Sequence, residues 1–279
     1  MSPDFSDKAE LLGLARLVRA LRKVAEPLGV EFFMMGAAAR DLMVRYAHGV
    51  ETSRATQDAD FAVMVRDWST YEALRSGLIA RGEFSARSGP ATHRLRHASG
   101  YPLDIVPFGG VERPDRTYAW PPDHGEVLDC FGMKEAFAAS ALVGLPEGVS
   151  VKVAPISAQA VLKIVAWQDR KYTYPGRDAI DLFLFFRHYM DLGNFDRASS
   201  DHPDLFEAAD FDLVEAGVRL LARDMAPLLG RTGVERLLSI LVPEADEMGG
   251  LLLAKQSGLQ LEHARRLLDV LCSELATIK

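Results

Sequence analysis

The feature that most constrains the fold is an apolar run at residues 30–35 that ends in a glycine. The run reads VEFFMM, which is typical of a short buried strand. The residues AARDLMVRYAHG, at 38–49, then show a helical pattern that stops at Gly49. A glycine between a strand and a helix lets the backbone turn tightly and approach a ligand. The pattern therefore predicts a strand, a turn at Gly36 and a helix.

Two aspartates stand at the start of the next predicted strand, DADFAVMV at residues 58–65. Residues two apart in a strand point to the same face, so Asp58 and Asp60 bring two carboxylates together while Phe61 and Val63 help to fill the interior. Adjacent carboxylates repel each other unless a cation or a proton lies between them. The alternative interpretation is an ordinary turn or cap at the start of a strand.

A third carboxylate, Asp104, lies within the apolar run YPLDIVPF at residues 101–108. An unpaired charge in such a strand would be costly, which argues that Asp104 has a partner. Three carboxylates at one edge of a sheet form a site of hard oxygen ligands suited to Mg²⁺, which takes its other ligands from substrate phosphates and water. The sequence therefore predicts a metal site at Asp58, Asp60 and Asp104.

The rest of the chain divides near residue 154. Before that point we expect a helix over 6–29, a helix over 68–82 and two strands joined by the turn ASGYP at 98–102. Residues 110–129 show no periodicity and are expected to form a long loop. From residue 158 the pattern is helical almost throughout. These patterns predict an α+β region with a mixed β-sheet at 1–154, followed by an α-helical domain at 155–279.

The composition narrows the class of protein. The 279 residues are 48% hydrophobic and 25% charged, which is ordinary for a globular protein. A formal charge of -7 does not resemble that of a dedicated nucleic-acid-binding protein. Cys130 and Cys272 lack metal-ligand spacing, which fits packing residues in a reducing compartment. We expect a cytoplasmic protein with no secretion signal and no membrane span.

The order of these motifs resembles that of the nucleotidyltransferase superfamily that includes DNA polymerase β and the CCA-adding enzymes. The family pattern is a strand ending in glycine, an Arg-Asp pair on the next helix, Asp-x-Asp on the next strand and a later third aspartate. Gly36, Arg40, Asp58, Asp60 and Asp104 stand in the corresponding places. The resemblance implies a polymerase-β-like nucleotidyltransferase domain. Ala37 departs from it, since family members usually have a serine or glycine there that contacts the triphosphate. A solvated first helical turn is the alternative interpretation of Arg40.

The helical half carries a second motif. Lys163, Trp167 and Arg170 lie at i, i+4 and i+7, and Asp178 and Asp181 follow on the next predicted helix. Internal ion pairs are the alternative explanation, Lys163 with Asp178 or Arg177 with Asp181. The spacing Lys-x(6)-Arg followed by Arg-Asp-x-x-Asp-Leu resembles the AbiEii/MenT group of nucleotidyltransferase toxins. That resemblance implies that Lys163 contacts nucleotide phosphates and that Asp178 completes the site, so that the helical domain contributes to catalysis.

The resemblance implies the transfer of an NMP from an NTP to an acceptor hydroxyl. Asp58, Asp60 and Asp104 would hold two Mg²⁺ ions, with Mn²⁺ as an alternative, and Asp104 would help to activate the hydroxyl. The Gly36 turn with the Ala37 amide, Arg40 and Lys163 would hold the β- and γ-phosphates.

For the acceptor, the resemblance favours the 3′ end of tRNA, in a toxin whose cognate antitoxin protein would be a second partner. Arg87, Arg94 and Arg96 lie in a basic stretch beside the expected site and are candidate contacts to the acceptor. A solvated hairpin face is the alternative interpretation of these arginines. A nucleotidyltransferase acting on a small molecule or a protein would share the same active-site residues. A non-catalytic nucleotide-binding module is the remaining alternative.

Overall fold

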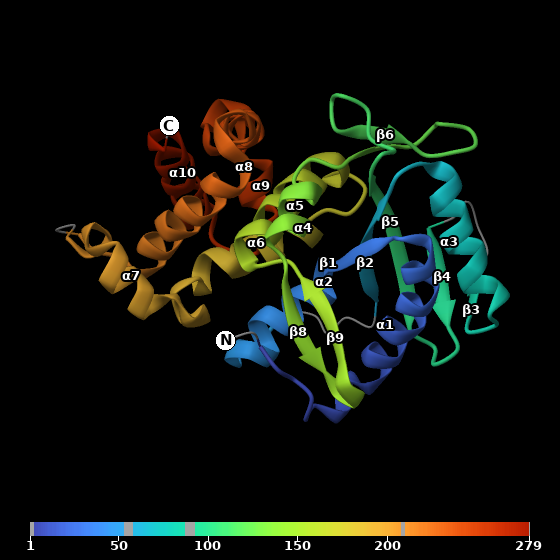
Figure 1. Ribbon diagram of the computed structural model, residues 1–279. Helices are drawn as coiled ribbons and strands as arrows, with labels where there is room; N and C mark the ends of the chain where they lie inside the picture. Colours follow the sequence, from blue (N-terminus) through green and yellow to red (C-terminus); the bar gives the residue numbers. More distant parts are fainter. Residues whose placement is uncertain (1–2, 53–57, 87–92, 208–209, 279) are drawn as a thin grey trace. The chain divides into compact units, whose positions relative to one another are not determined.

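The computed structural model describes residues 3–52, 58–86, 93–207 and 210–278. The chain divides into two compact units, Met1–Pro155 and Ile156–Lys279. The first unit contains a mixed sheet and the second is helical (Figure 1). The prediction of an α+β chain with a mixed sheet followed by a helical region is confirmed.

A seven-stranded sheet forms the centre of the first unit, with its strands in the order β3-β4-β5-β2-β1-β9-β8 (Figure 1). β1 pairs antiparallel with β2 and parallel with β9, whereas β2 pairs parallel with β5. The strands are β1 (Glu31–Met35), β2 (Ala59–Val65), β3 (Phe84–Ala86), β4 (Arg94–His97), β5 (Pro102–Gly109), β8 (Ala141–Leu145) and β9 (Val149–Val153).

Helices α1 (Leu12–Ala25) and α3 (Trp68–Ala80) pack against each other and against the sheet. A short turn, Glu26–Leu28, links α1 to β1, and Asp67 caps α3 by accepting a hydrogen bond of 2.7 Å from the backbone N–H of Thr70. Helix α2 (Gly36–Asp41) follows β1 and continues as a π-helical turn, Leu42–Tyr46. The predicted strand–glycine–helix unit is therefore present.

Helix α4 (Met133–Ala139) covers part of the sheet through three phenylalanines. Phe33 of β1 and Phe108 of β5 each lie about 6 Å, between ring centroids, from Phe137 of α4: the separations are 6.1 and 5.8 Å. Because side chains alternate along a strand, Met35 lies on the same face as Phe33, and Asp104 on the same face as Phe108. Met35 and Asp104 therefore both lie on the face of the sheet that α4 partly covers.

The expectation of a loop throughout residues 110–129 is wrong. A small hairpin of β6 (Thr117–Ala119) and β7 (Val127–Asp129) forms within it. Tyr118 and Trp120 are buried against Trp68 and Tyr71 of α3, with ring centroids 5.4 to 5.7 Å apart across the two segments. Burial of these large aromatic rings orders a stretch that has no periodic pattern of its own.

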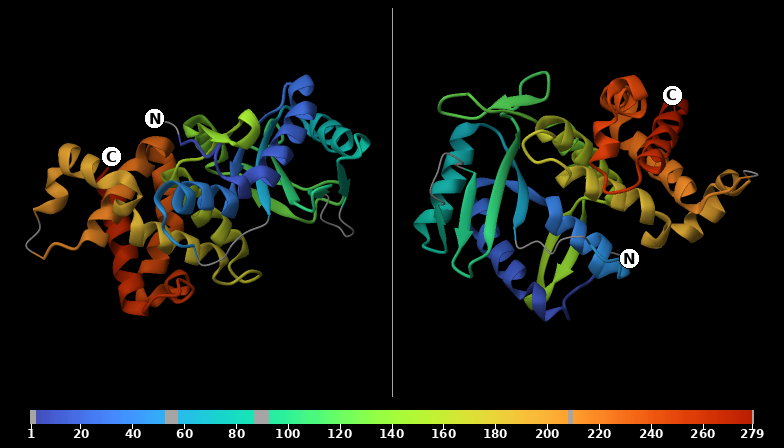
Figure 2. Two further views of the ribbon diagram at one scale, coloured as in Figure 1. Left: turned by 90° about the horizontal axis from the view of Figure 1, so that it is seen from below. Right: turned by 180° about the vertical axis from the view of Figure 1, so that it is seen from behind.

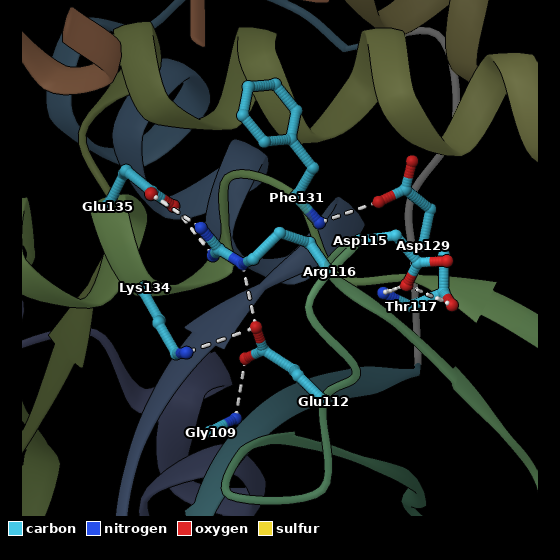
Figure 3. Close-up of polar contacts among 9 residues, drawn as sticks. All are labelled: Gly109, Glu112, Asp115, Arg116, Thr117, Asp129, Phe131, Lys134 and Glu135. Atoms are coloured by element: carbon cyan, nitrogen blue, oxygen red, sulfur yellow. Dashed lines mark hydrogen bonds and ion pairs between the residues drawn. The ribbon is translucent and has the colours of Figure 1, made fainter. Parts of the chain in front are cut away.

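Polar contacts join this hairpin to the end of β5 and to α4 (Figure 3). Glu112 accepts hydrogen bonds of 2.7 Å from the backbone N–H of Gly109 and from the Arg116 guanidinium. Arg116 also donates to Glu135 of α4 at 3.0 and 3.1 Å, and Lys134 lies 3.2 Å from Glu112. The bidentate Arg116–Glu135 pair therefore connects the segment to the helix.

The second unit consists of helices packed around α8 (Figure 2). Helix α8 is capped by Asp212 and changes direction at Gly230, where φ is 62° and ψ is 178°. It contacts α5, α6 and α10. The helices are α5 (Ile156–Arg170), α6 (Arg177–His188), α7 (Phe195–Asp201), α8 (Leu213–Ala245), α9 (Leu252–Lys255) and α10 (Leu261–Thr277), with shorter helical turns at Met190–Asn194, Pro203–Phe206 and Glu247–Gly249.

Cys130 and Cys272 are both buried, as expected of packing residues. Within the described residues, every helix is too short or too polar to cross a bilayer.

Candidate active site

One row of residues crosses four adjacent strands at the end of the sheet where β1 stops. Met35, the last residue of β1, is paired with Asp60 of β2, and Asp60 is paired with Asp104 of β5. Asp104 is in turn paired with Arg94 of β4. Residues paired in register place their side chains on the same face of a sheet. Two carboxylates and a guanidinium are therefore neighbours on the face that α4 partly covers.

Gly36 directly follows Met35 and lies against the Asp60 carboxylate. Its φ is +72°, a conformation that residues with a side chain rarely adopt. A Cβ atom at this position would lie 2.0 Å from Oδ2 and 2.8 Å from Cγ of Asp60. The absence of a side chain is thus required twice, by the backbone conformation and by the close approach to Asp60. Ala37, the next residue, is partly exposed.

Asp58 is exposed and precedes β2, which begins at Ala59. It was predicted to share a strand face with Asp60, but the regular strand does not reach it. Within the described residues, no three Asp, Glu, His or Cys side chains are grouped closely enough to hold a metal ion. The role of Asp58 as a third ligand stays a prediction.

Arg40 points inward. Its side chain is 1% exposed and donates hydrogen bonds of 2.9 and 2.6 Å from Nε and Nη2 to Oδ1 of Asp41, which is itself buried. The interpretation of these two residues as a solvated first turn is therefore wrong. Because a buried guanidinium needs a partner, the ion pair with Asp41 offsets the cost of burying the Arg40 charge in the first unit. A contact between Arg40 and a phosphate stays a prediction that this geometry does not favour.

Arg94 forms an ion pair with the carboxylate that it faces. Its Nε lies 3.4 Å from Oδ2 of Asp104, and the two side chains are 37% and 20% exposed. Arg96 is exposed and lies two residues further along β4, so it belongs to the same face. The structure thus places Arg94 against Asp104, and Arg96 on the same face of the sheet opposite Pro102. Arg87 lies outside the described residues.

In the helical unit, Lys163 and Arg170 of α5 pair with two aspartates of α6. Lys163 Nζ lies 3.1 Å from Oδ1 of Asp178 and 2.6 Å from Oδ2 of Asp181. Arg170 donates to both carboxylate oxygens of Asp178, at 2.6 and 2.7 Å. Both aspartates are 1% exposed. The internal pair of Lys163 with Asp178, weighed as an alternative from the sequence, is present.

The charges of this cluster determine its titration. Burial alone would raise the pKa of Asp178, but the hydrogen bonds and positive charges of Arg170 and Lys163 outweigh it and lower that pKa to about 2. Asp178 is therefore a stable anion with two cationic partners.

Asp181 belongs to the same cluster, although it was expected to pair with Arg177. Arg177 instead lies over the Tyr174 ring, 5.8 Å from its centroid. The i, i+3 spacing of Asp178 and Asp181 was the signal that both could face α5. Trp167 is buried and donates to Gln256 at 2.8 Å. A contribution of Lys163 and Asp178 to a catalytic site stays a prediction.

Two solved structures resemble this chain at low identity. One is the crystal structure of an antigenic nucleotidyltransferase-like protein from Paracoccidioides brasiliensis, with 19% identity and a TM-score of 0.39 over 76% of this chain and 96% of that one. The other is the solution structure of the antibiotic-resistance factor ANT(2″)-Ia, with 13% identity and a TM-score of 0.37 over 70% of this chain and 95% of that one. No family model and no curated protein matches the chain. At these TM-scores the likeness is too remote to transfer an activity.

Replacing Gly36 by alanine should disturb both the turn and Asp60. Gly49 is the matched control, because its φ is +71° and a Cβ there would have open space around it. We expect Gly49→Ala to lower the free energy of unfolding by about 1 to 2 kcal/mol through backbone strain alone. Gly36→Ala should cost more, measured by urea unfolding.

The contact itself can be isolated with Asp60→Ala, which removes the two carboxylate atoms nearest the new methyl group. In that background Gly36→Ala should cost less than it does in the native chain and approach the cost of Gly49→Ala, although Cβ of residue 60 remains 3.0 Å away. If Gly36→Ala lowered the free energy of unfolding equally in the native and the Asp60→Ala backgrounds, the close contact would be contradicted.

The Lys163–Arg170–Asp178 cluster predicts a specific dependence on pH. A carboxyl group with a lowered folded pKa stabilises the fold above its ordinary pKa of 3.8, and that stabilisation is lost as the pH falls toward about 2. Compared with Asp178→Asn, the native chain should therefore gain about 2 kcal/mol above pH 4. The difference should shrink progressively below pH 4, measured by urea unfolding at each pH.

Asp196→Asn, at an exposed position of α7, is the control and should change little at any pH. A difference between native chain and Asp178→Asn that stayed constant down to pH 2.5 would show that the Asp178 charge does not stabilise the fold.

Proposed function

We propose that this chain is a Mg²⁺-dependent nucleotidyltransferase, which moves an NMP from an NTP to an acceptor hydroxyl. The observation that supports this most is the pairing in register of Asp60 and Asp104 beside the Gly36 turn. Two neighbouring carboxylates are an unfavourable arrangement for stability alone, since they repel each other. Their position side by side at one end of the sheet, close to the main-chain turn at Gly36, fits a site for a cation and a phosphate.

The donor set fits Mg²⁺. Mg²⁺ in proteins uses one or two carboxylates and takes further ligands from substrate phosphates, which matches Asp60 and Asp104. Asp58, two residues before Asp60 and exposed, is the proposed third ligand. When bound, the ion neutralises phosphate charge and makes an acceptor hydroxyl more acidic. Two ions, or Mn²⁺ in their place, belong to the same proposal.

The chain's own residues have distinct roles in this proposal. Asp104 accepts the proton of the acceptor hydroxyl or orients that hydroxyl, because it lies on the partly exposed face beside Asp60. The amide of Ala37, after the Gly36 turn, is a candidate phosphate donor. A contact of Lys163 with nucleotide phosphates and a role for Asp178, as the resemblance to the AbiEii/MenT group implies, belong to the same proposal. Catalysis then comes mainly from positioning and electrostatics.

For the acceptor we propose the 3′ end of tRNA, and for the biological role a toxin with a cognate antitoxin. Arg96 supports an anionic acceptor, because it is exposed on the sheet face that carries Asp60 and Asp104. The proposed transfer can be tested by incubating the protein with Mg²⁺ and each labelled NTP, together with total tRNA, total protein or small hydroxyl compounds. Label on protein or on a small molecule would reassign the acceptor, and nucleotide binding without transfer would indicate a non-catalytic module.

Substituting the paired carboxylates should abolish transfer without unfolding the chain. We expect Asp60→Asn and Asp104→Asn each to reduce NMP transfer by roughly a hundredfold or more, because an amide neither neutralises a cation nor accepts a proton. The free energy of unfolding of Asp60→Asn should equal or slightly exceed that of the native chain, since carboxylate repulsion is removed. Asp104→Asn also loses its partly exposed ion pair with Arg94, so its free energy of unfolding should stay within about 1 kcal/mol of the native value. Labelled-NTP assays and urea unfolding provide the two measurements.

Glu72→Gln, at an exposed position of α3, is the control carboxylate and should keep full activity. If expression of the native chain slows growth, the Asp60→Asn variant should not. Normal turnover of either aspartate variant would remove that residue from the proposed site.

An acceptor contact by Arg96 predicts a particular salt dependence. With a tRNA acceptor, Arg96→Gln should weaken tRNA binding several-fold and reduce the slope of log affinity against log salt by about 1, as expected for one lost phosphate contact. NTP binding should be unchanged. Filter binding at a series of salt concentrations measures the slope.

Arg66→Gln is the matched control, because Arg66 is an exposed arginine just past the other end of β2. It should leave both affinity and slope unaltered. Equal slopes for the native chain and Arg96→Gln would assign Arg96 to a solvated hairpin face.

A further inference from the structure

The net charge of the chain is concentrated in one short segment of the helical unit. Residues 191–215 contain eight acidic residues and one arginine, a formal charge of -7, which equals the formal charge of the entire chain. The rest of the chain has as many basic as acidic residues. The segment includes α7, the turn Pro203–Phe206 and the start of α8, and α7 stands at the margin of the helical unit (Figure 1).

The same segment exposes aromatic rings that touch one another. Phe195 and Phe211 are 50% and 43% exposed. Phe206 lies between them, with ring centroids 5.8 Å from Phe195 and 5.5 Å from Phe211, the second pair being stacked. A surface that only kept the protein in solution would not need three contacting rings of which two are exposed. We call Phe195, Asp196, Phe206, Glu207, Asp210 and Phe211 the acidic aromatic surface.

Several acidic residues of the segment are already engaged within the fold. Asp204 pairs with Arg223 at 2.5 Å, Glu215 pairs with Arg266, and Asp212 caps α8. Asp196, Glu207 and Asp210 are instead exposed, and each is next to one of the phenylalanines in the sequence. Their negative potential is directed to solvent and disfavours nucleic acids and anionic membranes as occupants.

We propose that the acidic aromatic surface binds a basic polypeptide segment of a partner protein, rich in arginine and carrying an apolar side chain. Charge complementarity requires the positive charge, and the exposed rings require apolar or cation–π contact. Arginine satisfies both better than lysine, because its planar guanidinium stacks on aromatic rings and binds carboxylates through two hydrogen bonds. This surface is independent of the proposed catalytic residues.

The test is a selection of random displayed peptides on the full native chain and on two variants. One variant is Phe195→Ser/Phe211→Ser, and the other is Asp196→Asn/Glu207→Gln/Asp210→Asn. All five positions are exposed, so neither variant should unfold. Tyr172→Ser/Glu262→Gln is the control, since it removes an exposed aromatic ring and an exposed carboxylate elsewhere in the helical unit.

We expect the native chain and the control to enrich arginine-rich peptides with an aromatic or leucine residue, and both surface variants to lose that enrichment by at least about tenfold, which corresponds to 1.4 kcal/mol of binding free energy. A synthetic copy of an enriched peptide should bind several-fold more weakly when lysine replaces arginine, measured by fluorescence anisotropy.

Other outcomes would overturn the proposal. Equal enrichment on the surface variants, or enriched peptides without basic residues, would exclude this surface as the binding site. Loss of enrichment only on Asp196→Asn/Glu207→Gln/Asp210→Asn would show that the surface binds peptides by charge alone, which would contradict recognition by the aromatic rings. Self-association of the native chain that either variant abolished, measured by sedimentation, would assign the surface to a second copy of this chain.

Discussion

The candidate site depends on the placement of two like charges side by side. Asp60 and Asp104 are partners on neighbouring parallel strands, so the sheet itself prevents their backbones from separating. The repulsion between them must be offset locally, and Arg94 on the next strand does this for Asp104. On the other side, the main chain at Gly36 presses against Asp60 and limits where its carboxylate can turn. The pair is therefore held between a cation and a glycine turn.

The Asp178 cluster and the Asp104–Arg94 pair show how burial changes the role of a charge. In the helical unit, Asp178 and Asp181 are almost completely buried with Lys163 and Arg170 as fixed partners. Removing one member would leave an uncompensated buried charge, so that cluster is sensitive to mutation. Asp104 and Arg94 are partly exposed, and an ion pair of this kind is weak and easily exchanged for another partner. A ligand site requires charged side chains that can exchange one partner for another, whereas a structural cluster keeps the same partners.

The sequence predicted the features that depend on local patterns. Strand β1, the Gly36 turn and the start of β2 follow from residues close together in the chain, and so does the placement of Asp60 on one face. The pairing of Asp60 with Asp104 required a long-range register that no local pattern specifies. For the same reason Arg94 was assigned to an acceptor and not to Asp104. Arg40 was expected to face a ligand, but it is buried against Asp41. This burial could not be foreseen, because tertiary packing leaves no periodic signal in the sequence.

The hairpin of β6 and β7 was missed because three-residue strands cannot show alternation, and residues 130–153 gave no assignment although they form α4, β8 and β9. The parallel pairing of β2 with β5 also has a consequence for synthesis of the chain. Every residue of β5 that pairs with β2 lies between Leu103 and Gly109, so Asp60 emerges from the ribosome long before its partner. Pairing two parallel strands that are far apart in the sequence requires closing a long loop. The entropy cost of that closure makes such pairs form slowly. A nascent chain therefore contains the glycine turn and Asp60 for some time before Asp104 can pair beside them, so the two carboxylates come together only after β5 has been made.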